Sequence, residues 1–171
     1  MRIIKQGGEI ANTNGKSLEA TIRNLLLEKG YVELTKSENE FVVKHGGTHP
    51  SGWDSPDKWF TTQIPLTRNL YGARWRSDFY IVGQGYPNGI LVEVKWQGSG
   101  GSVDEKYVFT VESMISADIE AFKIFLLCGI GVRQGARDWI KKRIKSANAK
   151  KPHVKFMQSI DEFMHWANKE L

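Results

Sequence analysis

The chain has 171 residues, of which 40% are hydrophobic and 25% are charged, with one cysteine and a formal net charge of +5. These values fit a single domain spanning residues 1–171 and exclude a disulfide-stabilised scaffold. No apolar run approaches the roughly 20 residues of a membrane-spanning helix, and the first residues lack the apolar segment of a signal peptide. We therefore expect a cytoplasmic protein with no membrane partner, whose basic excess permits a polyanionic partner without requiring one.

The first expected elements are a helix and a strand. Residues 16–31 carry leucines and an isoleucine at helical spacing, with Ser17 as N-cap and Gly30 as the stop. Residues 40–45 resemble a short strand. The polar, aromatic stretch that follows contains Trp53 and is interpreted either as an arm that touches DNA or as a loop pinned over the core by its tryptophans.

Three strands are expected next, over residues 60–66, 73–83 and 90–97, with turn residues at 83–89. Beyond a glycine-rich segment, helices and strands alternate to the end of the chain over residues 102–115, 122–129, 133–150, 154–159 and 159–171. This order predicts a mixed α/β structure in which helices flank a central sheet.

Polar side chains interrupt the apolar strand at residues 90–97. Side chains alternate across a strand, so Glu93, Lys95 and Gln97 share one face. If residues 83–89 close an antiparallel hairpin, Asp78 lies beside Glu93 or Val94, roughly 5 Å away. The register decides whether Asp78 points to the same face as Glu93.

If these side chains converge, their chemistry indicates a metal site. Two adjacent carboxylates repel each other unless a cation lies between them, and carboxylates with carbonyl oxygens suit a hard ion such as Mg²⁺. Lys95 would then hold a water or the developing charge of a phosphorane-like transition state. The alternative is that Glu93 and Lys95 lie on a solvated face and that Asp78 pairs with Arg74 or Arg76.

Asp78, followed on the next strand by Glu93-Val94-Lys95, resembles the core of the PD-(D/E)XK nuclease superfamily. The resemblance covers about residues 15–128, leaving 129–171 as a C-terminal elaboration. It implies a restriction-endonuclease-like α-β-β-β-α-β core with a mixed central sheet, dependence on Mg²⁺ or Mn²⁺, and cleavage of nucleic acid. Ser77 stands where the family name has proline.

The resemblance also implies roles for individual residues. Asp78 and Glu93 would bind the metal together with the backbone carbonyl of Val94, and Lys95 would be the catalytic lysine. Gln97 and Glu19 would match side chains that some members of the superfamily add to the site.

Candidate contacts to nucleic acid are basic, hydroxyl-bearing or aromatic side chains in loops or near helix starts. Backbone amides at a helix N-terminus approach phosphates readily, and arginines spaced by four share a helical face. Ser102 also fits a capping box for the helix that follows it. The candidates are Arg74, Arg76, Ser99, Ser102, Lys106, Arg133, Arg137 and Trp53.

The sequence thus predicts a metal-dependent DNA endonuclease of restriction, homing or phage type, acting as a homodimer in a bacterial, phage or archaeal host cell. A Holliday-junction resolvase, a repair nuclease and a non-cleaving DNA-binding module of the same fold stay open. A protein-interaction module is a further alternative, in which Asp78, Glu93 and Lys95 would not converge.

Overall fold

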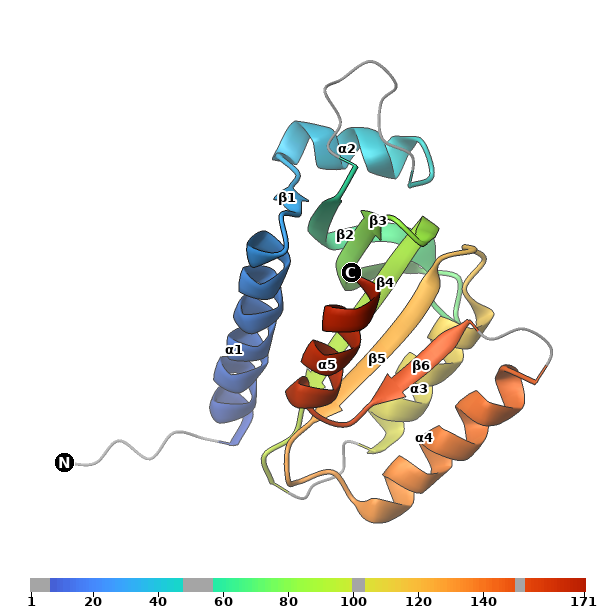
Figure 1. The fold of residues 1–171 in the computed structure, drawn as a ribbon. Helices are drawn as coiled ribbons and strands as arrows, with labels where there is room; N and C mark the ends of the chain where they lie inside the picture. The colour runs from blue at the N-terminus through green and yellow to red at the C-terminus, as the bar shows by residue number, and fades with distance from the viewer. Residues whose placement is uncertain (1–6, 48–56, 100–103, 150–152) are drawn as a thin grey trace.

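The computed structural model describes residues 7–47, 57–99, 104–149 and 153–171, and Figure 1 shows its helices and strands. The helices are α1 (Gly7–Glu28), α2 (Lys36–Lys44), α3 (Asp104–Ser116), α4 (Gln134–Ala147) and α5 (Ile160–Glu170). The strands are β1 (Val32–Glu33), β2 (Trp59–Arg68), β3 (Arg74–Gly83), β4 (Tyr86–Trp96), β5 (Phe122–Cys128) and β6 (Val154–Met157). Within the described ranges, no helix has the length and apolar character needed to cross a membrane.

The six strands form one mixed sheet in which their spatial order follows their sequence order. Strands β2, β3 and β4 form an antiparallel meander, whereas β4, β5 and β6 run parallel to one another. The parallel half needs crossover connections, which α3 and α4 supply. The predicted mixed α/β class, with helices flanking a central sheet, is confirmed.

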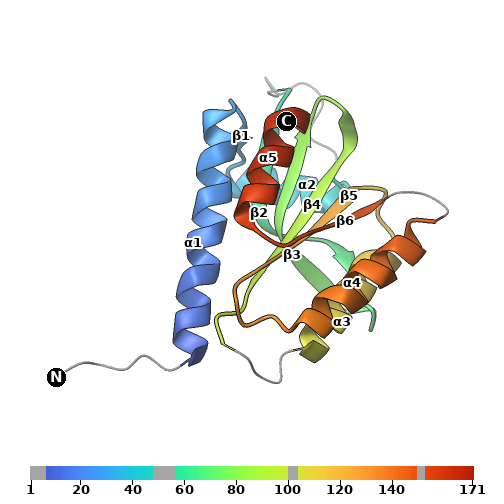
Figure 2. The same cartoon turned by 60° about the horizontal axis from the view of Figure 1, so that its bottom comes forward.

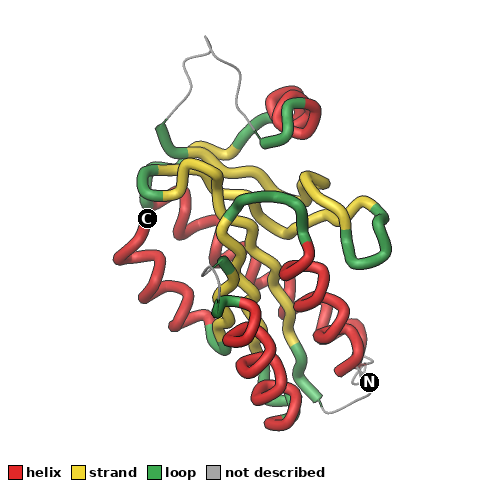
Figure 3. The backbone as a smooth tube through the Cα atoms, turned by 90° about the vertical axis from the view of Figure 1, so that its right-hand side faces the viewer, coloured by secondary structure: helices red, strands yellow, loops and turns green. Residues whose placement is uncertain are grey.

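Helices α1 and α5 cover one face of the sheet, where Ile22, Leu26 and Phe163 are fully buried against strand residues such as Val92. Figure 2 shows these two helices side by side, with α3 and α4 apart from them. The tube in Figure 3 shows helices on both sides of the strands. The sheet therefore separates two hydrophobic layers.

Helices α3 and α4 cover the opposite face, where Met114 and Ile140 pack with Phe125. A third cluster joins α2 to the meander through Val42 and Leu91. Strand β4 contributes to the first and third clusters, so it is buried on both faces. A buried central strand explains the nearly continuous apolar run in its sequence.

The first helix is longer than predicted. It begins at Gly7 rather than after Ser17, which is an interior residue whose carbonyl accepts a hydrogen bond from the Thr21 hydroxyl at 3.0 Å. The helix penalty of a serine, asparagine or glycine is only about 1 kcal/mol or less, so such residues do not force a start. Gly30, at φ +80, follows the end of the helix as predicted.

The prediction of a strand at residues 40–45 is wrong, because these residues lie mostly in α2. A capping box starts this helix: the Glu38 amide donates to Thr35 Oγ1 at 3.4 Å, and the Thr35 amide donates to Glu38 Oε2 at 2.6 Å. Reciprocal capping of this kind satisfies backbone donors at a helix start and favours a helix over a strand.

Candidate active site

The β3–β4 hairpin carries Asp78 and Glu93 on neighbouring strands, next to its last paired residues. The pair nearest the site is Phe79 with Val92, and Asp78 and Glu93 are the residues that adjoin this pair on the two strands. This is one of the two positions that the sequence left open for Asp78. Strand β4 begins at Tyr86, earlier than predicted, because the tight turn needs only the residues before it, including Gly85 at φ +87.

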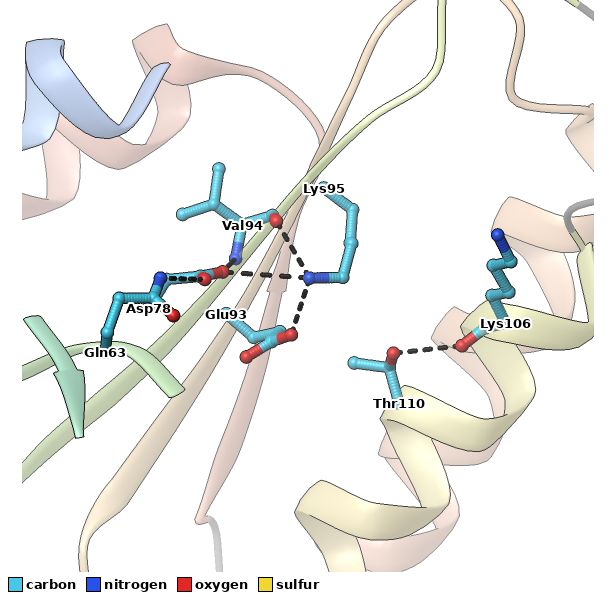
Figure 4. A network of polar contacts seen from close by, with 7 residues as sticks. All are labelled: Gln63, Asp78, Glu93, Val94, Lys95, Lys106 and Thr110. Carbon is cyan, nitrogen blue, oxygen red and sulfur yellow. Dashed lines mark hydrogen bonds and ion pairs between the residues drawn. The ribbon is translucent and has the colours of Figure 1, made fainter. Parts of the chain in front are cut away.

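Asp78, Glu93 and Lys95 converge in one polar cluster, shown in Figure 4. The Lys95 ammonium lies 2.6 Å from Glu93 Oε1 and 3.7 Å from Asp78 Oδ2. It also donates to the Val94 carbonyl at 3.2 Å, while the Val94 amide donates to Asp78 Oδ2 at 2.7 Å. The alternative in which Asp78 pairs with Arg74 or Arg76 is therefore not what the structure shows.

Burial controls the protonation of this cluster. Glu93 is 5% exposed, and burial is the main cause that raises its pKa to about 7; the Lys95 ammonium lowers this pKa and the negative charge of Asp78 raises it. Burial lowers the pKa of Lys95, but the carboxylates of Glu93 and Asp78 outweigh it, so the pKa is raised. Lys95 is thus held as an ammonium that donates hydrogen bonds.

Helix α1 brings Glu19 within electrostatic reach of the cluster. Burial raises the pKa of the Glu19 carboxyl, Asp78 raises it further, and Lys95 lowers it. The charges of Asp78 and Lys95 reach Glu19 because α1, which carries Glu19, packs against β4. A third acidic side chain therefore faces this part of the sheet.

The donor atoms of the cluster fit a hard divalent cation. Within the described residues, no three acidic, histidine or cysteine side chains gather closely enough to hold an ion by themselves. However, Mg²⁺ commonly binds through one or two carboxylates and keeps several waters. Asp78, Glu93 and the Val94 carbonyl supply oxygen donors, and Glu93 Oε2 is buried without a hydrogen bond from any described residue. These residues fit the metal that the resemblance implies.

Two glutamines differ in their relation to the cluster. Gln97 was a candidate, but its amide nitrogen donates to the Ser99 carbonyl at 2.5 Å, which directs it to the loop. Gln63, on β2, was not a candidate, yet its amide nitrogen donates to Asp78 Oδ1 at 3.0 Å. The sequence signals no site residue in β2, because the contact depends on an irregular backbone at Gln63.

Several candidate contacts to nucleic acid are exposed near this end of the sheet. Arg74 and Arg76 are exposed at the start of β3, where they alternate with the partly buried Trp75. Residue alternation places the two arginines on the same side of the strand as Asp78. Lys106 is exposed on the first turn of α3, and Figure 4 shows its ammonium pointing away from Glu93.

The candidates at the start of α4 have partners within the protein. Arg133 is the N-cap residue and lies 3.5 Å from Asp104, in a largely exposed ion pair. Arg137 donates to the Gly129 carbonyl at 2.8 Å, which holds the loop between β5 and α4. Ser99 is exposed after β4.

Two further candidates, Trp53 and Ser102, lie outside the described residues. The capping box expected at Ser102 lies outside them with it.

A separate hollow of about 480 Å³ lies near the β3–β4 turn and the connection from α3 to β5, where Asn88 and Glu120 line it. It lies at the opposite end of β4 from Lys95 and shares no lining residue with the cluster. The carboxylate–lysine cluster therefore lies outside this hollow.

The sheet order, the flanking helices and the hairpin-borne carboxylate–lysine cluster are consistent with a restriction-endonuclease-like fold. A family model described as a PD-(D/E)XK nuclease superfamily domain matches residues 10–171. The chain belongs to the PD-(D/E)XK nuclease superfamily. Comparisons with curated proteins and with solved structures gave no match.

Proposed function

We propose that the protein is a divalent-metal-dependent endonuclease that hydrolyses phosphodiester bonds in DNA. The observation that carries this proposal is the convergence of Asp78, Glu93 and the Lys95 ammonium on one face of the β3–β4 hairpin. Isolated buried charges cost free energy, so a buried cluster of this kind favours a functional role over a structural one.

In this proposal Asp78, Glu93 and the Val94 carbonyl hold Mg²⁺ or Mn²⁺. The ion, when bound, would act as a Lewis acid that lowers the pKa of a water molecule and neutralises the charge of the phosphate. Lys95 positions the attacking water and donates to the charge that develops on the phosphate. Glu19 adjusts the charge of the site, whereas Gln97, which bonds to the Ser99 carbonyl, acts only through the adjoining loop.

The exposed basic residues support a polyanionic substrate. Arg74 and Arg76 extend from Asp78 along one side of β3, and Lys106 and Arg133 lie at the starts of α3 and α4. Lysine and arginine contacts to phosphates give affinity without reading sequence. We propose that these residues hold the DNA backbone beside the cluster, with Ser99 and Arg137 as further contacts.

The restriction, homing or phage type of endonuclease is the preferred subclass, with a junction resolvase or a repair nuclease as the alternative. One small domain offers one active site, and cutting both strands commonly takes two, so we propose a homodimer. The single, buried Cys128 supports a reducing, cytoplasmic setting in a bacterial, phage or archaeal host cell.

The test is cleavage of supercoiled plasmid and of a four-way junction, with Mg²⁺, Mn²⁺ or EDTA. We expect metal-dependent nicking or linearisation, and Lys95→Ala should lower the rate on the order of 10²-fold or more while the variant still folds and binds DNA. Lys169→Ala, which removes an exposed lysine from α5, is the matched control and should cleave as the wild type does.

The cleavage products distinguish the remaining functional alternatives. Linear plasmid without accumulated nicked circles would favour the dimer, and preferred cutting of the junction would favour a resolvase. Binding of both substrates with no cleavage would favour the non-cleaving module, and absence of binding would contradict the nucleic-acid function.

A further inference from the structure

Gln63 has an unusual backbone conformation in the middle of a strand. Its φ is +53, and it is the one non-glycine residue with positive φ in the described part of the chain. Left-handed backbone is unfavourable for a residue with a Cβ, and glutamine, unlike asparagine or aspartate, is not enriched there. Such strain persists only where the surrounding structure holds it, and it is often found at functional sites.

The strained residue stands opposite Asp78. Strand β2 pairs with β3 through Thr62 with Phe79 and Ile64 with Ser77, so Gln63 and Asp78 occupy the facing positions between these pairs. No backbone pairing is present at this position, and the Gln63 amide nitrogen instead reaches Asp78 Oδ1 at 3.0 Å. Figure 4 shows the Gln63 side chain directed at the carboxylate.

Asp78 thus receives one donor from each neighbouring strand. Gln63 on β2 binds Oδ1, and the Val94 amide on β4 binds Oδ2 at 2.7 Å. Two donors on different oxygens fix the rotation of the carboxylate about its own axis. A neutral amide does this without adding positive charge, whereas a lysine or arginine in its place would compete with a bound cation.

We infer that Gln63 is a positioning residue for the metal site, and that the strained backbone of β2 exists to aim its amide at Asp78. This inference rests on the proposed function, because it assigns Gln63 to the same site. Hydrogen-bond partners of metal-binding carboxylates typically matter 10–100-fold for metal affinity or activity. Gln63 would act through Asp78 and without contact to the ion.

Two variants separate the amide from the backbone strain. Gln63→Leu removes the amide and keeps a side chain at positive φ, whereas Gln63→Gly removes both. Relief of about 1 kcal/mol of strain should make the glycine variant melt roughly 2–4 °C above the leucine variant. If Gln63 positions Asp78, both variants should nevertheless lose 10–100-fold in Mn²⁺ affinity, measured by titration calorimetry without DNA.

A purely structural role predicts a different pattern. Mn²⁺ affinity would then follow the melting temperature, so the glycine variant would bind more like the wild type than the leucine variant does. Gln134→Leu is the control, because Gln134 makes the same type of bond to Asp138, at 2.8 Å, on the exposed face of α4. It should leave Mn²⁺ affinity unchanged.

The outcomes also separate this inference from the proposed function. Binding of Mn²⁺ by the wild type, with unchanged affinity in both Gln63 variants, would overturn the role of Gln63 and leave the metal site standing. If the wild type binds no Mn²⁺, or if Asp78→Ala binds it equally well, the proposed metal site fails and the inference fails with it.

Discussion

At the scale of single residues, the site depends on one ammonium among acidic side chains. Lys95 contacts Glu93 Oε1, the Val94 carbonyl and Asp78 Oδ2. These oxygens belong to the three groups that would bind the divalent cation. The lysine therefore offsets part of the negative charge of the site in the metal-free protein. A divalent ion bound through these oxygens would compete with the Lys95 ammonium for them.

Glu93 makes the stability of the metal-free protein dependent on pH. Its pKa is raised to about 7 in the folded state from an ordinary value of 4.5. Between these values Glu93 binds more protons in the folded protein than in the unfolded chain, so the stability that Glu93 contributes is fully present below about pH 4.5 and is lost as the pH rises through about 7. Glu93→Gln, which cannot ionise, should therefore gain stability relative to the wild type as the pH rises.

The measurement is urea unfolding in EDTA at pH 5 and pH 8. The free-energy difference between Glu93→Gln and the wild type should be more favourable to the variant at pH 8. Glu40→Gln, in the exposed part of α2, is the matched control. Equal differences at both pH values would contradict the raised pKa.

At the scale of elements, the two helices on one face of the sheet are joined by a forked ion pair. Arg143 on α4 binds Glu112 on α3 through Nε to Oε1 at 2.6 Å and Nη2 to Oε2 at 2.8 Å. A double-mutant cycle of Arg143→Met and Glu112→Gln should give a coupling free energy of about 1 kcal/mol, because fork geometry places the pair at the upper end for partly exposed ion pairs.

Replacing Arg143 with lysine tests whether the forked geometry contributes to the coupling free energy. Arg143→Lys keeps the charge but presents one amine, so it should recover less than half of the coupling measured by urea unfolding. The coupling should also weaken in 0.5 M salt, since the pair is partly exposed. Full recovery with lysine would mean that charge alone joins the helices.

Some elements were predicted correctly from the sequence and others were not, for physical reasons. Strands β3 and β4 were predictable because alternation and turn residues both favour a hairpin there, and because buried charge at Glu93 has few structural explanations. Helix α2 was missed because Phe41, Val42 and Val43 favour a strand locally, while the deciding signal was the capping pair Thr35 and Glu38.

Gln63 was missed for a different reason. Its contribution depends on a left-handed backbone at an irregular position of the β2–β3 ladder, and its residue type does not indicate either feature. A side chain whose role arises from local distortion of a strand becomes visible only when the facing residue, Asp78, is known.

At the scale of the whole molecule, the C-terminal part of the chain completes the core. Phe163 on α5 is fully buried in the same cluster as Ile22 on α1, although they come from opposite ends of the chain. Phe163→Ala should cost about 3–5 kcal/mol of unfolding free energy, because it leaves a large cavity between these helices and the sheet.

Urea unfolding of Phe163→Ala beside His165→Ala, an exposed neighbour on α5, measures this cost. The histidine variant should be close to neutral. If Phe163→Ala does not fold, Phe163→Leu provides a smaller loss at the same place. A cost of Phe163→Ala below about 1 kcal/mol would show that α5 is peripheral to the core.

The β3–β4 hairpin has a consequence for how the chain folds. Asp78, Glu93, Val94 and Lys95 all belong to this one hairpin, whose strands are joined by a tight turn. Hairpins form on a timescale of about 1–10 μs, earlier than contacts between distant segments. The two acids therefore meet while water still surrounds them, and the lysine arrives on the same strand as their counter-ion. The chain should consequently reach its native state in the absence of any divalent ion.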